Sequence, residues 1–403
     1  MNTVLHVLER SIPYISGYTI RSKAIIETLS KQGWHSVVVT SPRHKDFEQI
    51  MEEINGVLYI RCPSRMQKFT TPTRLYKAIE FIFSPRILEK TILEVCKKYK
   101  PKIIHAHSFY PLKGGAYHVA WKFGIPYIYE LRGLLEESGV TQGWSVKGWR
   151  YRLIQRFDNY NLMKADAIIT ICEALKTEVV HRGVPESKIV VVPNGVDTQA
   201  FKPIEPDYEL AAQLGLSDNT LVIGYIGSLV AWEGLENLFY AFSNILQIVS
   251  NVKLLIVGDG PLRPHLLKLR DQLGIHSFTI FTGQIPYENI ARYYSICDVL
   301  VLPRTRARVN ALVTPLKPLE IMAMGKPLIA SDLPALREII NPGKTGVLVE
   351  PEDPKRLAEA ILSLLSDPQE RKRLGANARE WVVKNRDWRS IVTRYHEVYS
   401  KFL

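Results

Sequence analysis

The sequence lacks the features of several large protein classes. No apolar run approaches the roughly 18–20 residues that cross a bilayer as a helix, which argues against an integral membrane protein. The N-terminus has neither the basic start nor the cleavage site of a secretion signal, and it predicts a first strand instead. The four cysteines are isolated and match no zinc or redox spacing, so a reducing cytoplasm is the expected location.

Acidic residues are scarce in the first half of the chain. The whole chain has a net charge of +12, and residues 1–200 hold 28 basic against 18 acidic side chains. Two stretches, 61–102 and 143–156, combine basic with aromatic residues, a composition that suits the surface of an anionic membrane. The alternative is a set of solvated helix faces whose aromatic side chains pack inward. Nucleic acid is not an expected partner, because no recognised binding module accompanies these charges.

Short apolar runs alternate with amphipathic stretches in both halves, the pattern of an α/β fold with parallel sheets. The strands expected in the first half are Val4–Leu8, Ser36–Thr40, Val57–Arg61, Lys102–Ala106, Pro126–Glu130, Ala167–Ile171 and Ile189–Val192. Those expected in the second half are Leu221–Ile226, Lys253–Val257, Thr279–Phe281, Val299–Leu302, Pro327–Ala330 and Gly346–Val349. Helices are expected between them, for example over Ile20–Lys31, Pro85–Tyr99 and Trp149–Lys164. The turn-rich segment 193–206 separates the halves, which predicts two doubly wound domains with ligands at their strand C-termini.

Two strand ends in the first half carry candidate ligand-binding residues. Gly17 precedes a helix whose free amides would favour an anion, although an ordinary strand–helix turn is the alternative. His105 and His107 point to one face of a strand near its carboxyl end, and the alternative there is one buried and one exposed histidine. A metal is not expected, because no carboxylate or thiol lies at a supporting spacing. No GxGxxG with a downstream acidic residue indicates a dinucleotide.

The most informative segment is 314–327, with the sequence TPLKPLEIMAMGKP. Pro318 suits the start of a short helix, where free amides around Leu316 and the charge of Lys317 would face an anion. Three arginines stand at alternate positions just upstream: Arg304, Arg306 and Arg308. They would point the same way from an extended chain, as suits a diphosphate, and a solvated loop is the alternative.

Three motifs stand in the order and spacing of a known family: Pro193-Asn-Gly-Val-Asp197, Gly-Asp-Gly-Pro-Leu at 258–262, and Pro318-Leu-Glu-Ile-Met-Ala-Met-Gly325. On these motifs the chain resembles the retaining glycosyltransferases of family 4 over nearly its whole length. The resemblance implies a GT-B fold, with two Rossmann-like domains facing a cleft and a C-terminal helix crossing back to the N-terminal domain. It assigns residues 1–197 to the acceptor, 198–380 to a nucleotide-sugar donor and 381–403 to the returning helix. The pairing of Pro303-Arg304 with 313–320 looks closest to a subgroup associated with exopolysaccharide and exosortase loci.

The resemblance also implies roles for single residues. Glu320 matches a glutamate that binds the donor ribose, and Leu316 and Lys317 match positions whose amides meet the diphosphate. His107 matches a histidine near the transferred sugar, and Gly17 matches a glycine-rich loop near donor phosphate and acceptor. The candidate catalytic residues are therefore His107, Glu320 and Lys317. The candidate donor-binding residues are Gly17, Gly227, Ser228, Arg304, Arg306, Arg308, Leu316, Lys317 and Glu320.

Three positions depart from the family pattern. Leu312 replaces the first glutamate of a paired motif, and Ser228 and Glu233 replace the two cations that normally neutralise the donor diphosphate. A carboxylate beside a diphosphate is repulsive, so Glu233 should point away or the phosphates should lie elsewhere. We expect Lys317 and one or more of the three arginines to compensate.

The sequence thus predicts transfer of a sugar from a UDP- or GDP-sugar to a glycan or lipid-linked acceptor, with retention of configuration, in the cytoplasm or at the inner face of the cell membrane. No Asp-x-Asp occurs, so neither a metal nor another cofactor is expected. No carboxylate pair suggests double displacement, which favours same-face attack with the departing phosphate as the base. The alternatives are a nucleotide-sugar epimerase or phosphorylase of the same fold, and a non-catalytic sugar-nucleotide or polyanion binder.

Overall fold

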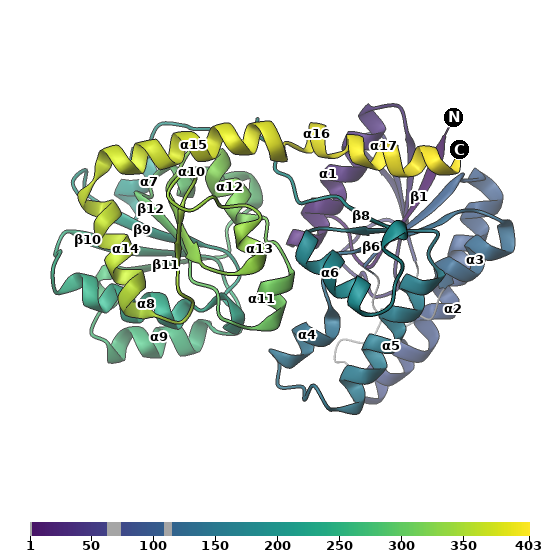
Figure 1. The fold of residues 1–403 in the computed structure, drawn as a ribbon, viewed down its shortest axis with the longest axis horizontal. Coiled ribbons are helices and arrows are strands. Elements are labelled where there is room, and N and C mark those ends of the chain that lie inside the picture. Colours follow the sequence, from purple (N-terminus) through teal and green to yellow (C-terminus); the bar gives the residue numbers. More distant parts are fainter. Residues whose placement is uncertain (1, 63–73, 109–114) are drawn as a thin grey trace. The chain divides into compact units, whose positions relative to one another are not determined.

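The structure, a computed structural model, describes residues 2–62, 74–108 and 115–403, with side chains from residue 85 onward in the second range. The chain divides into two compact units (Figure 1). Unit 1 comprises residues 1–193 and 388–403, and unit 2 comprises residues 194–387. Each unit has a mainly parallel sheet accompanied by helices, so the predicted class of two α/β domains with a helical C-terminus is confirmed.

Unit 1 contains an eight-stranded sheet in the order β3-β4-β2-β1-β5-β6-β7-β8. Its strands are β1 (Thr3–Leu8), β2 (His35–Thr40), β3 (Met51–Ile54), β4 (Val57–Arg61), β5 (Ile103–His107), β6 (Tyr127–Leu131), β7 (Ala167–Thr170) and β8 (Ile189–Val191). All neighbours pair in parallel except β3 and β4, which form a hairpin. The turn residues Asn55 and Gly56 both have positive φ, as a tight hairpin requires. Sequence analysis missed β3, because this short edge strand is largely solvent-exposed and holds two glutamates.

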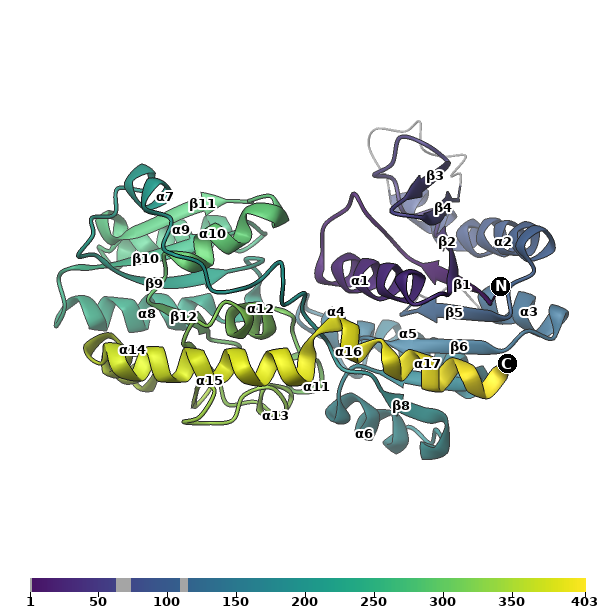
Figure 2. The same ribbon diagram turned by 90° about the horizontal axis from the view of Figure 1, so that it is seen from above.

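The helices of unit 1 come from both ends of the chain, as seen from above in Figure 2. They are α1 (Gly17–Lys31), α2 (Arg74–Tyr99), α3 (Gly115–Phe123), α4 (Leu135–Val140), α5 (Trp149–Lys164), α6 (Glu173–His181), α16 (Trp388–Ile391) and α17 (Thr393–Tyr399), with short 3-10 turns at Glu186–Lys188 and Ser400–Phe402. Ser16 begins α1 with a capping box shared with Thr19. The C-terminal α16 packs against α1, and α2 packs against α3.

Unit 2 contains a six-stranded parallel sheet in the order β11-β10-β9-β12-β13-β14. Its strands are β9 (Leu221–Ile226), β10 (Val252–Val257), β11 (Thr279–Gly283), β12 (Val299–Leu302), β13 (Leu328–Ser331) and β14 (Val347–Val349). Its helices are α7 (Tyr208–Gln213), α8 (Leu235–Leu246), α9 (Arg263–Gln272), α10 (Ile290–Ser295), α11 (Arg308–Leu312), α12 (Lys317–Ala323), α13 (Pro334–Arg337), α14 (Pro354–Ser366) and α15 (Pro368–Arg386), with 3-10 turns at Ala231–Glu233, His276–Phe278 and Tyr287–Asn289.

The boundary of the units differs slightly from the predicted 197/198 and 380/381. It falls after Pro193 and after Asp387, because the linker is bonded to the end of α15. The Val196 amide donates to the Arg386 carbonyl over 2.8 Å, and Thr198 donates to the Asp387 carboxylate. Arg379 donates to the carbonyls of Phe201 and Thr198 over 2.7 and 2.9 Å. None of the helices within the described residues has the length and apolar character to span a bilayer.

Candidate active site

Each sheet has a point where the strand order reverses, and open α/β sheets bind ligands at the carboxyl ends of the strands flanking that point. In unit 2 the reversal lies between β9 and β12, whose ends lead to Gly227 and Arg304. In unit 1 it lies between β1 and β5, which lead to Gly17 and end at His107. The sequence-predicted residues therefore fall into two groups, one in each unit.

Three charged side chains form the centre of the unit 2 group, and we call them the Glu233 cluster: Glu233, Arg304 and Lys317. Glu233 accepts from Arg304 over 3.0 Å and lies 3.1 Å from the Lys317 ammonium. Lys317 also donates to the Tyr225 hydroxyl over 2.9 Å. Both Arg304 and Lys317 pair with the Glu233 carboxylate. That Glu233 points away from the donor diphosphate, or that the phosphates lie elsewhere, stays a prediction.

The electrostatics of the Glu233 cluster follow from this pairing. Burial opposes the Glu233 charge, but Arg304 and Lys317 outweigh it and lower the pKa of this carboxyl to about 2. Burial lowers the pKa of Lys317, with Arg304 acting in the same direction and Glu233 against it. Two cations and one carboxylate leave one net positive charge. The Lys317 side chain is 19% exposed, against 9% for Arg304 and 5% for Glu233, so an anion from solvent meets Lys317 first.

The other two predicted arginines, Arg306 and Arg308, lie in different local surroundings. Arg306 pairs with Glu350 and Glu352 on the exposed surface, and Arg308 is the first residue of α11. The expectation that alternate positions would direct all three arginines the same way is wrong, since the chain turns into a helix instead of staying extended. Of the three, Arg304 contacts Glu233.

Glu320 lies in α12, one turn beyond Lys317. Its two carboxylate oxygens accept from the hydroxyls of Tyr287 and Tyr294, each over 2.9 Å. Burial raises the pKa of Glu320, while these hydroxyls and Lys317 act against the shift. The sequence did not indicate the two tyrosines, because they precede β12 by a short helical segment and carry no motif of their own.

Gly227 and its neighbours bring backbone close to Lys317. Gly227 has φ +155°, and a Cβ at this position would lie 2.1 Å from Lys317 Cε. Ser228 is exposed, and its carbonyl accepts from the Tyr225 hydroxyl over 2.8 Å. Leu316 is the residue that caps α12 without a side-chain hydrogen bond. The structure thus gathers Gly227, Arg304 and Lys317 in unit 2, beside Ser228 and the first turn of α12.

His107 lies in unit 1, fully buried at the end of β5. His105 is also fully buried, and the two rings stack with centroids 3.9 Å apart, so the predicted shared face is confirmed and an exposed member of the pair is excluded. Arg132 donates to His107 Nδ1, which must therefore accept. His107 Nε2 then carries the hydrogen and donates to His6 Nδ1 over 3.0 Å. Burial, His105 and Arg132 lower the pKa of His107 well below 6.5, so the ring is neutral.

A carboxylate that the sequence analysis missed organises these histidines. Glu130, on β6, accepts from Arg21 over 2.9 Å, from Arg132 over 2.6 Å and from the Tyr395 hydroxyl over 2.7 Å. It also lies 3.3 Å from His105 Nε2. Burial opposes its charge, but the two arginines prevail and hold the pKa of Glu130 well below its ordinary value. A charged residue within an apolar strand, Tyr-Ile-Tyr-Glu-Leu, was the available signal.

His6, His105 and His107 also place ring nitrogens within 4.8 Å of one another. The sequence places no carboxylate at a supporting spacing near these histidines, but the fold brings Glu130 to 3.3 Å from His105 Nε2. The residues nevertheless fit a cation poorly, because Arg132 and His6 occupy both nitrogens of His107 and two arginines already share one carboxylate. Metal-independent chemistry stays a prediction.

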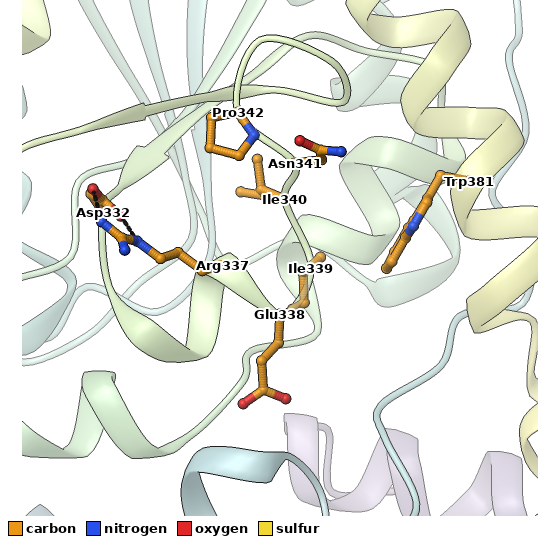
Figure 3. A pocket seen from close by; sticks show the side chains of 8 residues that line it. All are labelled: Asp332, Arg337, Glu338, Ile339, Ile340, Asn341, Pro342 and Trp381. Carbon is orange, nitrogen blue, oxygen red and sulfur yellow. Dashed lines mark hydrogen bonds and ion pairs between the residues drawn. The ribbon is translucent and has the colours of Figure 1, made fainter.

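A separate hollow of about 480 Å³ lies in unit 2 beside the end of β13 (Figure 3). Asp332 and Arg337 lie on one side of it and pair over 2.7 Å, while Trp381 lies on the other. Arg386 lies over the Trp381 ring, 5.1 Å from its centroid. The residues lining this hollow include none of the predicted donor-binding residues.

Comparison with solved structures identifies the fold of the protein as GT-B. The structure superposes on sucrose-phosphate synthase from Thermosynechococcus elongatus with a TM-score of 0.80 and 23% identity, covering 100% of this chain and 99% of that one. Anabaena HepE in complex with UDP matches with a TM-score of 0.75 and 18% identity over 100% of both chains. At these identities the likeness concerns the fold.

Sequence comparison places the chain more closely. Residues 207–381 match the family model of glycosyl transferases group 1, and residues 16–195 match the glycosyl transferase 4-like domain. An uncharacterised glycosyltransferase of Methanocaldococcus jannaschii is 27% identical over 96% of this chain and 94% of its own length. Sulfoquinovosyl transferase SQD2 of Arabidopsis thaliana is 27% identical over 96% of this chain and 71% of its own. Both models describe glycosyltransferases and together they match most of the chain, so the protein is a glycosyltransferase.

Proposed function

We propose that the protein transfers a hexose from a nucleoside-diphosphate sugar to a hydroxyl acceptor with retention of configuration and without a metal. The observation that carries the proposal is the Glu233 cluster at the switch point of unit 2. It combines one net positive charge, a partly exposed ammonium and a glycine that lets Lys317 lie against the backbone. A diphosphate is the leaving group that such a site would stabilise as its charge develops.

The Glu233 cluster supplies cations in place of the two that the family pattern has at positions 228 and 233. Glu233 holds Lys317 and Arg304 in place, so the carboxylate acts as an anchor for the cations instead of a charge facing the donor. Lys317 would contact the diphosphate, and Arg304 would help to hold the shared Glu233 carboxylate in place. Arg306 and Arg308 are weaker candidates, because Arg306 is paired with two glutamates and Arg308 begins α11.

Two further residues have assigned places in this mechanism. Glu320 would accept hydrogen bonds from the donor ribose, and Tyr287 and Tyr294 keep its carboxylate oriented for that role. His107 would lie near the transferred sugar in unit 1, where Arg132 fixes its tautomer. A neutral His107 with both nitrogens engaged is a poor base, which favours the departing phosphate as the acceptor of the hydroxyl proton.

The acceptor we propose is a glycan or a lipid-linked glycan at the cytoplasmic face of the cell membrane, within exopolysaccharide synthesis. Its support is the motif pair Pro303-Arg304 and 313–320, in which the structure joins Arg304 to Glu233 and Lys317 to the same carboxylate. HepE was solved with UDP-glucose, and a mycobacterial relative of 29% identity over 65% of this chain is a GDP-mannose-dependent mannosyltransferase. UDP- and GDP-sugars are therefore the first donors to test.

The experiment begins with a thermal-shift panel of nucleoside diphosphates and their sugars, since a donor that binds the folded protein raises its unfolding temperature. The donor that binds is then incubated with the protein and acceptor extracts. Transfer or slow hydrolysis supports the proposal, an epimerised donor or binding without turnover contradicts it, and an inverted product by NMR contradicts retention.

Lys317→Met tests the proposed diphosphate contact. Loss of one charge-assisted contact should weaken nucleoside-diphosphate binding at least about tenfold by calorimetry. Lys355→Met removes an exposed cation of α14 in the same unit and should leave the affinity unchanged. An unchanged affinity of the Lys317→Met protein for the nucleoside diphosphate would show that Lys317 does not contact the diphosphate.

A further inference from the structure

The helix α5 of unit 1 carries an unusual outward face, which we call the α5 face: Trp149, Arg150, Arg152, Leu153, Arg156, Tyr160, Met163 and Lys164. Trp149, Leu153, Arg156 and Tyr160 follow at steps of four, three and four, so they form one stripe along the helix. Figure 1 shows α5 at the edge of unit 1. Instead of the usual polar surface, the stripe combines three apolar or aromatic side chains with one cation.

The opposite, inward face of α5 packs against the core of unit 1, so the residues of the α5 face are not needed for that packing. Tyr151, Ile154 and Leu162 are buried, and the Tyr151 hydroxyl donates to Glu137 over 2.6 Å. Of the aromatic residues before the helix, Trp144 packs inward against Gly139. The alternative of inward-packed aromatics therefore holds for Trp144 and Tyr151 and fails for Trp149, which is 70% exposed.

The charge of this segment has one sign. Residues 143–164 include five exposed cations: Lys147, Arg150, Arg152, Arg156 and Lys164. Within the described residues, no carboxylate forms an ion pair with any of them. The one acidic residue of the segment, Asp158, is buried, and burial together with Glu136 raises its pKa to about 8, so it is mostly uncharged near neutral pH.

Large apolar groups project among these cations. Besides Trp149, the exposed fractions are 52% for Met163, 39% for Tyr160 and 37% for Leu153, and Val146 just before the helix is 54% exposed. The Lys164 ammonium lies 5.9 Å from the Tyr160 ring and 5.8 Å from that of Tyr117 on α3. Exposure of these apolar side chains to water is unfavourable. The interface of a bilayer, in contrast, accommodates aromatic rings beside cations.

We propose that the α5 face docks unit 1 on an anionic lipid bilayer, with the cations at the headgroups and Trp149, Leu153 and Tyr160 at the acyl boundary. A bilayer fits better than a folded partner because exposed aromatic and apolar side chains lie among cations that no carboxylate of the described residues pairs, as suits acyl chains beside anionic headgroups. In the other basic segment, 61–102, residues 63–73 and the side chains of 74–84 lie outside the described residues.

The test is sedimentation of the full chain with vesicles, in the absence of nucleotide, so that its outcome is independent of transferase activity. Vesicles of phosphatidylcholine mixed with phosphatidylglycerol should bind the protein, and vesicles of phosphatidylcholine alone should bind it at least about tenfold more weakly. Equal binding to both, or to neither, would overturn the proposal.

Two variants identify the surface. Arg152→Glu with Arg156→Glu should reduce binding to the anionic vesicles at least about tenfold. Lys355→Glu with Arg356→Glu makes the same charge change on exposed residues of α14 and should bind as the wild type does. Binding of the α5 variant equal to that of the α14 variant would contradict the assignment.

The apolar part has its own variant and control. Trp149→Ala with Leu153→Ala should weaken vesicle binding, while Tyr208→Ala with Ile248→Ala, two exposed side chains of unit 2, should not. Circular dichroism and the unfolding temperature establish that each variant is folded. Tight binding of a DNA oligonucleotide that the α5 substitutions abolish, without vesicle binding, would replace the bilayer with nucleic acid.

Discussion

Glu233 occupies the position at which this chain differs most in charge from the pattern it resembles. A carboxylate there would be harmful if it faced a diphosphate, yet the structure buries it between Arg304 and Lys317. A buried carboxylate with two cations is stable only while both partners remain, since removing one member leaves an uncompensated charge. A glutamate at position 233 in place of the usual cation therefore changes the charge of the site and also holds Arg304 and Lys317 together.

Glu233→Gln should destabilise unit 2 by roughly 3 kcal/mol near neutral pH, because it leaves Arg304 and Lys317 buried together without an anion. The pKa of Glu233 lies at about 2 against an ordinary 4.5, so its carboxylate contributes stability that is present above about pH 4.5 and lost as the pH falls toward 2. The difference between wild type and variant in urea unfolding should therefore shrink over that acidic range.

Glu359→Gln is the matched control, because Glu359 is exposed and pairs only loosely, at 3.5 Å, with Arg356. It should leave the free energy of unfolding unchanged at each pH. A pH-independent difference for the Glu233 variant would show that the loss comes from packing instead of charge.

At the scale of elements, the loop after β9 determines where Lys317 lies. Gly227 has a φ that other residues rarely adopt, and its missing Cβ is the space that the Lys317 side chain fills. A few residues on, Gly234 has φ +68°, and a Cβ there would lie 2.0 Å from the Pro303 carbonyl oxygen. The two glycines thus bring the β9 and β12 loops and the first turn of α12 together.

Gly227→Ala should push Lys317 out of place and weaken nucleoside-diphosphate binding at least about tenfold, with a loss of stability of about 1 kcal/mol from the backbone strain. Gly274→Ala is the control, because Gly274 also has a positive φ but no atom within 4 Å of a Cβ. The control should lose similar stability and keep its affinity. Calorimetry with UDP or GDP and thermal unfolding measure the two effects.

At the scale of the whole molecule, the chain leaves unit 1 at Pro193 and returns to it at Trp388. The returning segment completes the buried charges of unit 1: Tyr395 donates to Glu130, and the Tyr399 hydroxyl lies 2.7 Å from His105 Nδ1. Arg21 in turn donates to the Tyr395 hydroxyl over 2.9 Å. Unit 1 is therefore incomplete without residues 388–403.

Truncation after Asp387 should destabilise unit 1 alone, because it leaves Glu130 and His105 without their tyrosine partners. Hydrogen exchange should show lost protection in β5 and β6, while β9 and β12 keep theirs. Truncation after Tyr399 retains both tyrosines and should preserve protection in both units. If truncation after Asp387 removed protection from β9 and β12 as much as from β5 and β6, this assignment would be contradicted.

The secondary structure could be predicted closely because apolar strands and amphipathic stretches are local patterns. Each of the thirteen expected strands corresponds to an observed one, with ends shifted by at most two residues, and among the strands of the described residues β3 alone was not predicted. The shared face of His105 and His107 was also predictable, since it follows from the two-residue period of a strand.

The partners of the site residues could not be predicted in the same way. The spacing of Arg304, Arg306 and Arg308 suggested one direction, but the start of α11 and the glutamates at 350 and 352 separate them. Glu130 and Tyr395 are 265 residues apart in sequence, and no local pattern connects them.

The class of fold, the positions of the strands and the segments that carry the ligand-binding residues follow from the amino-acid sequence, because periodicity and short motifs encode those features locally. The pairing of charges depends on tertiary contacts, which join Glu233 to Lys317 and Arg304, and Glu130 to Arg21 and Arg132. The tertiary structure also places Trp149 outside while Tyr151 is buried. The reason is physical, since the energy of a charge or an aromatic ring depends on neighbours that only folding brings together.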